Sequence, residues 1–276
     1  MCLVAGLSLS AQASVVFDAD FTGSPLPDDS GTRDLNVSAA DLNAGTAVGS
    51  WSFDGSATDA GVLNAGNNAL TSPSLSLDDV EGDVTVLTGA FSSAGDIGGG
   101  NTVTYAWDWA VSRGGGNKDY VFSALSGGTA AYQITWQAST RNVFWVDTDG
   151  DSHLIANLNA TSYFQGSKVL RNANNDLGVE LLITDSGVDN GDGTGTGATI
   201  SLDTDNDGIF DVISVIGPST AGLTSLDGLS FALEGTGTNR GQRIAEVSAV
   251  SIVPEPSSLA LAITGAACML WRRRAQ

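Results

Sequence analysis

Hydrophobic and polar residues alternate with a period of two through much of the chain between residues 14 and 253. The clearest run is 103–111, where large apolar side chains fall on one face and small or polar ones on the other. A second run, 132–138, repeats the pattern. The apolar face consists of Val103, Tyr105, Trp107, Trp109 and Val111 in the first run and of Tyr132, Ile134 and Trp136 in the second. This period predicts strands with one buried face.

Eight further segments favour strands, and clusters rich in Gly, Asn and Asp separate many of them. They are 84–91, 119–125, 141–147, 177–184, 199–203, 209–216, 229–234 and 244–253. No helical period of useful length occurs before residue 259, which argues against a parallel sheet with crossover helices. We therefore expect one all-β domain over 14–253, an antiparallel two-sheet sandwich that resembles jelly-roll or lectin-like domains. The stretch 18–76 alternates more weakly, and we expect it to add edge strands to the same domain.

Residues 1–13 have the composition of a signal peptide that lacks its usual basic start. Apolar and small residues lead to Ala11-Gln12-Ala13, the small-x-small pattern that signal peptidase recognises. We predict cleavage between Ala13 and Ser14. The alternative is that this segment forms a buried N-terminal strand.

The C-terminal end has three parts: a Pro-Glu-Pro triplet, an apolar run and a basic cluster. Pro254, Glu255 and Pro256 are followed by the uncharged run 259–271 and then by Arg272, Arg273 and Arg274. As a helix the run covers about 20 Å, which is short for a bilayer core of about 30 Å. The arginines would keep this end on the cytoplasmic side of the inner membrane.

This arrangement resembles the PEP-CTERM sorting signal of Gram-negative bacteria, over residues 253–276. The resemblance implies that an exosortase recognises and cuts the chain near Pro254–Pro256, and that the helix holds the chain in the membrane until then. It also implies association with extracellular polysaccharide or a biofilm matrix. The alternative is an ordinary C-terminal membrane anchor.

The formal net charge is −20, and 26 of the 31 acidic residues are Asp. Without residues 1–13 and the part that follows the Pro-Glu-Pro triplet, with Glu255 still counted, the chain has eight basic residues and a net charge of −23. We therefore expect that the chain does not bind nucleic acid, because phosphate contacts need clustered Lys and Arg. Cys2 and Cys268 lie in the end segments, so we expect neither a disulfide nor thiol chemistry in the exported domain.

The densest acidic segment, residues 203–211, matches the first half of a calcium-binding loop. Asp203, Asp205 and Asp207 take ligand positions 1, 3 and 5, the backbone carbonyl of Ile209 takes position 7, and Asp211 takes position 9. Position 12 is Ser where such loops have Glu, and residues 212–216 favour a strand. Calcium and an ion-free acidic hairpin turn both remain open. A second cluster, 147–151, lacks the later ligands, and a plain hairpin turn explains it better.

Catalytic patterns are sparse, and we expect no enzymatic activity. His153 is the single histidine, so a zinc site or a Ser-His-Asp triad could use at most one histidine. No two Glu outside the sorting signal lie within ten residues of each other, although Asp–Asp pairs from distant strands stay open. Five Trp lie outside the tail, and core packing explains them better than sugar stacking. They are Trp51, Trp107, Trp109, Trp136 and Trp145.

These features together predict an exported structural protein of the cell surface or extracellular matrix, processed by signal peptidase and an exosortase. A lectin-like carbohydrate-binding module with matrix polysaccharide as its ligand is the alternative. A secreted glycoside hydrolase or lyase is the third candidate.

Overall fold

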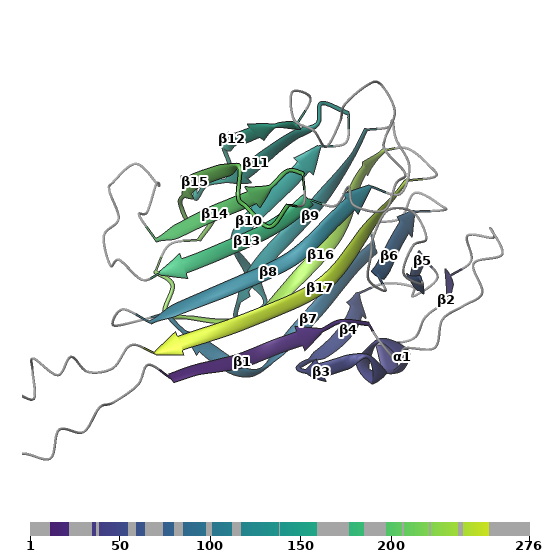
Figure 1. Ribbon diagram of the computed structural model, residues 1–276, viewed down its shortest axis with the longest axis horizontal. Coiled ribbons are helices and arrows are strands. Elements are labelled where there is room, and N and C mark those ends of the chain that lie inside the picture. Colours follow the sequence, from purple (N-terminus) through teal and green to yellow (C-terminus); the bar gives the residue numbers. More distant parts are fainter. Residues whose placement is uncertain are drawn as a thin grey trace, which may run out of the picture.

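Two antiparallel sheets pack face to face in the computed structural model of the chain (Figure 1). The structure describes residues 12–21, 35–36, 39–54, 59–63, 74–79, 85–97, 101–111, 117–137, 139–158, 177–184, 197–205, 207–220, 222–236 and 240–253. The predicted all-β sandwich is confirmed. The predicted C-terminal helix, 259–271, lies outside the described residues.

The first sheet has ten strands, in the order β15-β14-β13-β8-β17-β6-β5-β2, with β1 paired to β17 and β3 paired to β1. Only the short pair β2–β5 is parallel among its described strands. The bounds of these strands are β1 Gln12–Ala19, β2 Leu35–Asn36, β3 Thr46–Val48, β5 Asp59–Leu63, β6 Ser74–Asp79, β8 Thr102–Val111, β13 Leu177–Thr184, β14 Ala198–Asp203, β15 Val212–Ile216 and β17 Arg240–Val253.

The second sheet has seven strands, in the order β12-β11-β10-β9-β16-β7-β4. Their bounds are β4 Ser50–Asp54, β7 Thr85–Asp96, β9 Asn117–Ser126, β10 Thr129–Gln137, β11 Asn142–Val146, β12 Ser152–Asn157 and β16 Ser225–Thr236. A single short helix, α1 (Ala39–Ala44), is found among the described residues and contacts β3 and β4. Each segment predicted as a strand contains one, and the weakly alternating N-terminal stretch adds the short strands β2 to β6.

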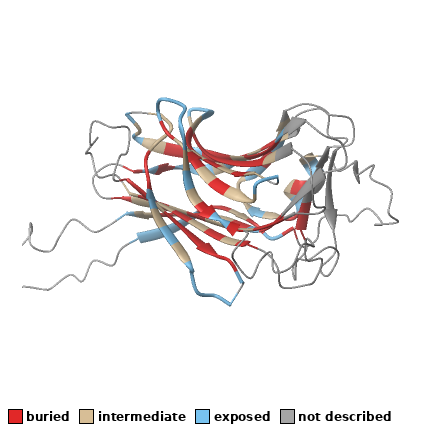
Figure 2. Ribbon diagram, turned by 90° about the horizontal axis from the view of Figure 1, so that it is seen from above, coloured by how far each residue is buried: buried red, intermediate tan, exposed pale blue. Residues whose placement is uncertain are grey.

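The core lies between the sheets, where the predicted apolar faces of β8 and β10 meet (Figure 2). Trp107 of β8 stacks on Phe122 of β9 with ring centroids 3.9 Å apart. Trp109 meets Trp136 of β10 edge to face. The Tyr105 hydroxyl donates a hydrogen bond across the core to the carbonyl of Gly228 in β16 (3.1 Å). These contacts join the ten-stranded sheet to the seven-stranded sheet.

Candidate functional site

The predicted signal-peptidase site lies at the end of the sandwich where β17 ends. Ala13 and Ser14 are exposed residues in β1, and they pair with Ile252 and Ser251 near the end of β17. Figure 1 shows that β1 begins and β17 ends at the same end of the sheet. Cleavage after Ala13 would therefore remove only the first two residues of β1, and it stays a prediction.

The remaining sorting residues, Pro254–Pro256, the run 259–271 and Arg272–Arg274, lie outside the described part of the chain. Within the described part, no helix has the length and apolar character needed to cross a membrane.

The acidic loop Asp203–Asp211 joins β14 to β15 and brings three carboxylates together. One carboxylate oxygen from each of Asp203, Asp205 and Asp211 lies within 4.8 Å of the others, so the three are placed to share a cation. Asp203 is buried, while Asp205 and Asp211 are exposed. Asp207, the remaining predicted carboxylate ligand, does not belong to this group of three. Its Oδ1 accepts a hydrogen bond from the backbone N–H of Ile209 (2.8 Å).

Backbone amides fold the loop around Asp203. Its Oδ2 accepts a hydrogen bond from Gly208 (2.8 Å), and its Oδ1 accepts longer ones from Asp205 and Asp207 (3.3 Å each). Gly208 has a φ of 84°, the left-handed conformation that glycine adopts at no steric cost. This is the sharp bend that the sequence pattern predicted at this position.

Two residues of the loop have pKa shifts of opposite sign. Although Asp205 is exposed, its pKa is raised, first by partial desolvation of its carboxylate within the loop and then by the negative charges of Asp207, Asp211 and Asp203. The pKa of Asp211 is lowered, because its Oδ2 accepts hydrogen bonds from the hydroxyl (2.6 Å) and the backbone N–H (2.8 Å) of Thr204. A divalent cation would relieve the repulsion at Asp205.

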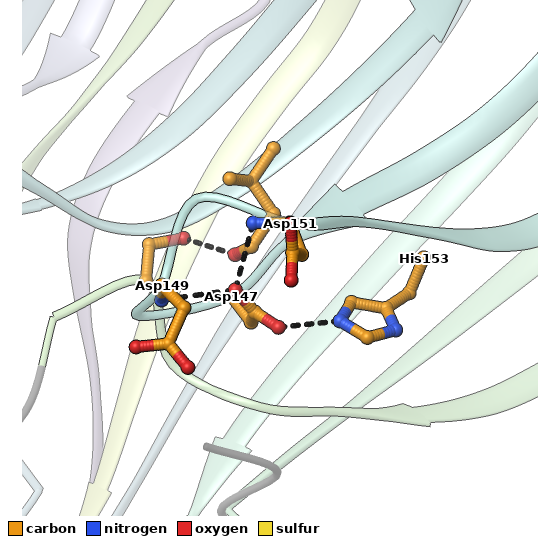
Figure 3. Close-up of polar contacts among 6 residues, drawn as sticks. Asp147, Asp149, Asp151 and His153 are labelled. Atoms are coloured by element: carbon orange, nitrogen blue, oxygen red, sulfur yellow. Dashed lines mark hydrogen bonds and ion pairs between the residues drawn. The ribbon is translucent and has the colours of Figure 1, made fainter. Parts of the chain in front are cut away.

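The second acidic cluster forms the hairpin between β11 and β12 (Figure 3). Oδ1 of the buried Asp147 accepts hydrogen bonds from the backbone of Asp149 and Asp151 (2.9 Å each). Its Oδ2 contacts Nε2 of His153 at 2.5 Å, and this contact is the main cause of the lowered pKa of Asp147. The His153 ring stacks on Trp145, with centroids 4.4 Å apart. Both oxygens of Asp147 thus serve to hold the turn together.

All five Trp outside the tail are buried, and the most exposed of them, Trp145, is 5 % exposed. The interpretation as core residues is confirmed. These rings provide no aromatic platform for a sugar.

Sequence reasoning missed a line of polar side chains that crosses five strands of the seven-stranded sheet. The line, called the polar row below, consists of Asn157, Asn142, Gln137, Asp119 and Glu234, each directly opposite the next on the neighbouring strand. Each alternates with buried neighbours, so the row lies on the outer face of the sheet. Only the strand order reveals the row, since its members are up to 115 positions apart.

Two interactions within the polar row give it chemical character. The Asn157 amide donates a hydrogen bond to Oδ1 of Asn142 (2.7 Å). The pKa of Asp119 is raised, first by burial of its carboxyl group and second by the charge of Glu234. The row thus presents amides beside a pair of carboxyl groups.

Comparison with known proteins identifies the C-terminal signal. Residues 253–274 match the PEP-CTERM protein-sorting motif, which directs exosortase-dependent export and cell-surface sorting. The predicted resemblance is confirmed. No curated protein sequence matches the chain.

The sandwich is similar to several solved structures at low sequence identity. Arcelin-5, a lectin-like defense protein from Phaseolus vulgaris, matches with a TM-score of 0.49 and 8 % identity, covering 88 % of this chain and 99 % of that one. Metal-free lectin I-B4 from Griffonia simplicifolia matches with a TM-score of 0.46 and 11 % identity, over 73 % and 92 % of the two chains. The botulinum neurotoxin serotype G binding domain matches at 0.47 and 13 % identity, over 86 % of this chain but only 47 % of that one.

Proposed function

We propose that the chain is a non-enzymatic structural protein of the cell surface or extracellular matrix, delivered there by its sorting signal. One observation carries the proposal: the sorting motif begins at Val253, the last residue of β17. The folded sandwich is thus followed at once by the signal, so the sandwich is the exported cargo. The net charge of the exported part, −23 with Glu255 counted, favours a soluble, well-hydrated surface.

Processing at the Pro-Glu-Pro triplet tests this delivery. In the producing bacterium, the double variant Pro254→Ala/Pro256→Ala should stay full-length and membrane-bound, because the exosortase no longer recognises the triplet. Immunoblots of membrane and extracellular fractions measure this outcome. The variant Ser257→Ala/Ser258→Ala, directly beside the triplet, is the matched control and should be processed normally. Normal processing of the Pro variant would contradict the proposal.

A structural calcium ion in the acidic loop Asp203–Asp211 is part of this proposal. Three convergent carboxylates and a tight glycine bend support it, and the carbonyl of Ile209 is a candidate fourth ligand. Calorimetric titration with calcium tests it, and absence of binding at millimolar calcium would contradict it.

Polysaccharide binding is the second candidate, and the polar row favours it. Amide and carboxylate side chains are the groups that bind sugar hydroxyls through paired hydrogen bonds. Gln137→Ala should weaken retention of the protein in affinity gels that contain the bacterium's own extracellular polysaccharide. Gln133→Ala, four residues earlier on the same face of β10, is the control. Equal retention of both variants would exclude this row as the binding surface.

The same polysaccharide assay separates binding from hydrolysis. Asp119 and Glu234 lie directly opposite each other on neighbouring strands, and glycoside hydrolysis uses a pair of carboxyl groups. Release of new reducing ends that disappears in Glu234→Gln would contradict the non-enzymatic proposal.

A further inference from the structure

The free edge of the ten-stranded sheet has an apolar surface. β15 is the last strand of that sheet, and among the described strands it pairs only with β14. Seven large hydrophobic side chains are exposed in the described part of the chain, and four of them lie between residues 209 and 215. They are Ile209, Phe210, Ile213 and Val215, with Ile213 and Val215 67 % and 64 % exposed.

β15 also lacks the features that normally protect an edge strand. Exposed edges generally carry charged residues, proline or a bulge, because their unpaired backbone groups attract other strands. The segment Val212-Ile-Ser-Val-Ile216 has no charge and no proline, and its pairing with β14 is regular. In a chain with a net charge of −20, such an uncharged, β-branched edge stands apart from the rest of the surface.

The pattern of residue types in β15 is the same in both directions, with two β-branched residues on each side of Ser214. When two copies pair antiparallel about a two-fold axis at Ser214, Ile213 lies opposite Val215 of the other copy, and Ser214 lies opposite itself. All the remaining pairs then join two β-branched residues, which favour cross-strand packing. We propose that β15 pairs in this way with β15 of a second copy, forming one continuous sheet across a symmetric dimer.

The charge distribution favours this antiparallel arrangement over a parallel one. Antiparallel pairing about Ser214 separates Asp211 of one copy from Asp211 of the other by six residues, about 20 Å. This exceeds the screening length of about 10 Å at 0.1 M salt. Parallel pairing would instead place the two acidic loops side by side, about 5 Å apart. The apolar strand therefore lets two strongly acidic molecules meet with their Asp203–Asp211 loops far apart.

Cysteine trapping tests the register of the dimer. In a full chain with Cys2→Ser and Cys268→Ser, purified in mild detergent, Ser214→Cys should give a disulfide-linked dimer on gentle oxidation. Directly opposed residues in an antiparallel pair have Cα atoms about 4.5–5.5 Å apart, which a disulfide can bridge. Leu154→Cys, at the exposed edge strand of the other sheet, is the matched control and should give no disulfide-linked dimer. No crosslink at Ser214, or equal crosslinking of both variants, would overturn the proposal.

The oligomeric state provides an independent test that does not depend on disulfide geometry. Light scattering after size exclusion should give a dimer fraction that rises with protein concentration. Val215→Lys should shift the mass to that of a monomer, because it places a charge in the centre of the pairing. Since Val215 is exposed, this variant should retain the β-sheet circular dichroism of the parent chain. A parent chain that stays monomeric, or a Val215→Lys chain that stays dimeric, would overturn the proposal.

Discussion

Asp205 lies at the point of greatest electrostatic repulsion in the acidic loop. Its pKa is raised by partial desolvation and by three neighbouring carboxylates, so its charged form is disfavoured in the folded, cation-free state. Stability without calcium should therefore fall as the pH rises through this raised pKa. A bound cation would reverse the effect by favouring the charged form.

The variant Asp205→Asn separates these two contributions. It should raise the melting temperature without calcium, because one repelling charge is removed, and it should abolish the increase in melting temperature that calcium gives. Melting curves with chelator and with millimolar calcium measure both effects. Asp149→Asn, in the other acidic turn, should leave the calcium response intact. A full calcium response in Asp205→Asn would exclude Asp205 as a ligand.

Asp147 and His153 link the stability of the β11–β12 hairpin to pH. The contact with His153 lowers the pKa of Asp147, so the pair stabilises the fold above the unfolded pKa of Asp, about 3.9. This stabilisation is lost as the pH falls through the lowered, folded-state pKa.

Replacing His153 should therefore move acid unfolding to higher pH. His153→Leu keeps an apolar side chain of similar size against Trp145 but removes the contact that lowers the pKa of Asp147. Circular dichroism followed from pH 7 downwards measures the midpoint. Ser152→Ala, exposed on the same strand, is the control, and an unchanged midpoint in His153→Leu would refute the role of the pair.

At the scale of single elements, Gly228 in β16 lies where this strand closely approaches its neighbour β7. A Cβ atom at this position would come within 2.6 Å of the carbonyl oxygen of Gly89 in β7, a backbone atom that cannot rotate away. The Gly228 carbonyl also accepts the hydrogen bond from Tyr105 that crosses the core.

Gly228→Ala should lower the free energy of unfolding by about 1–3 kcal/mol, the range for overpacked cores. Chemical denaturation measures this, provided that the transition stays two-state. Ser230→Ala, two residues along on the outer face of the same strand, should change stability much less. Equal stability of the two variants would mean that the strands separate without cost.

The strands that sequence predicted are those with one buried and one outer face. β8 and β10 meet this condition, because their alternate side chains pack against the opposite sheet. β1 does not, since a bulge near Val16 buries both Val16 and Phe17 and breaks the period of two. The segment 209–211 continues the alternation of β15 but lies in the loop, where the Asp211 side chain binds Thr204.

The candidate sites also differ in how far the sequence could predict them. The convergence of Asp203, Asp205 and Asp211 was predictable, because a tight local turn brings near neighbours in sequence together. The pairing of Asp119 with Glu234 was not, because it depends on β9 and β16 being adjacent in the sheet. No local pattern encodes that adjacency.

At the scale of the whole molecule, the pairing of β1 with β17 places the predicted signal-peptidase site beside residues 251–253, the last that the structure describes. The N-terminus of the exported protein should be Ser14, and the pairing of Ser14 with Ser251 then remains in place after cleavage. N-terminal sequencing of protein recovered from outside the cell measures this. A sequence that starts at Met1 or Cys2 would show that β1 is retained entire.

The register of the strands sets how far the acidic loop lies along the sheet from Val253. Asp203 pairs with Gly178, Gly178 pairs with Asp108, and Asp108 pairs with Ala245, so Asp203 lies level with a residue eight positions before Val253. Eight residues of strand span roughly 26 Å. The acidic loop and the last residues of β17 thus lie at different levels of the sandwich, and we expect cleavage near Pro254–Pro256 to leave the loop unchanged.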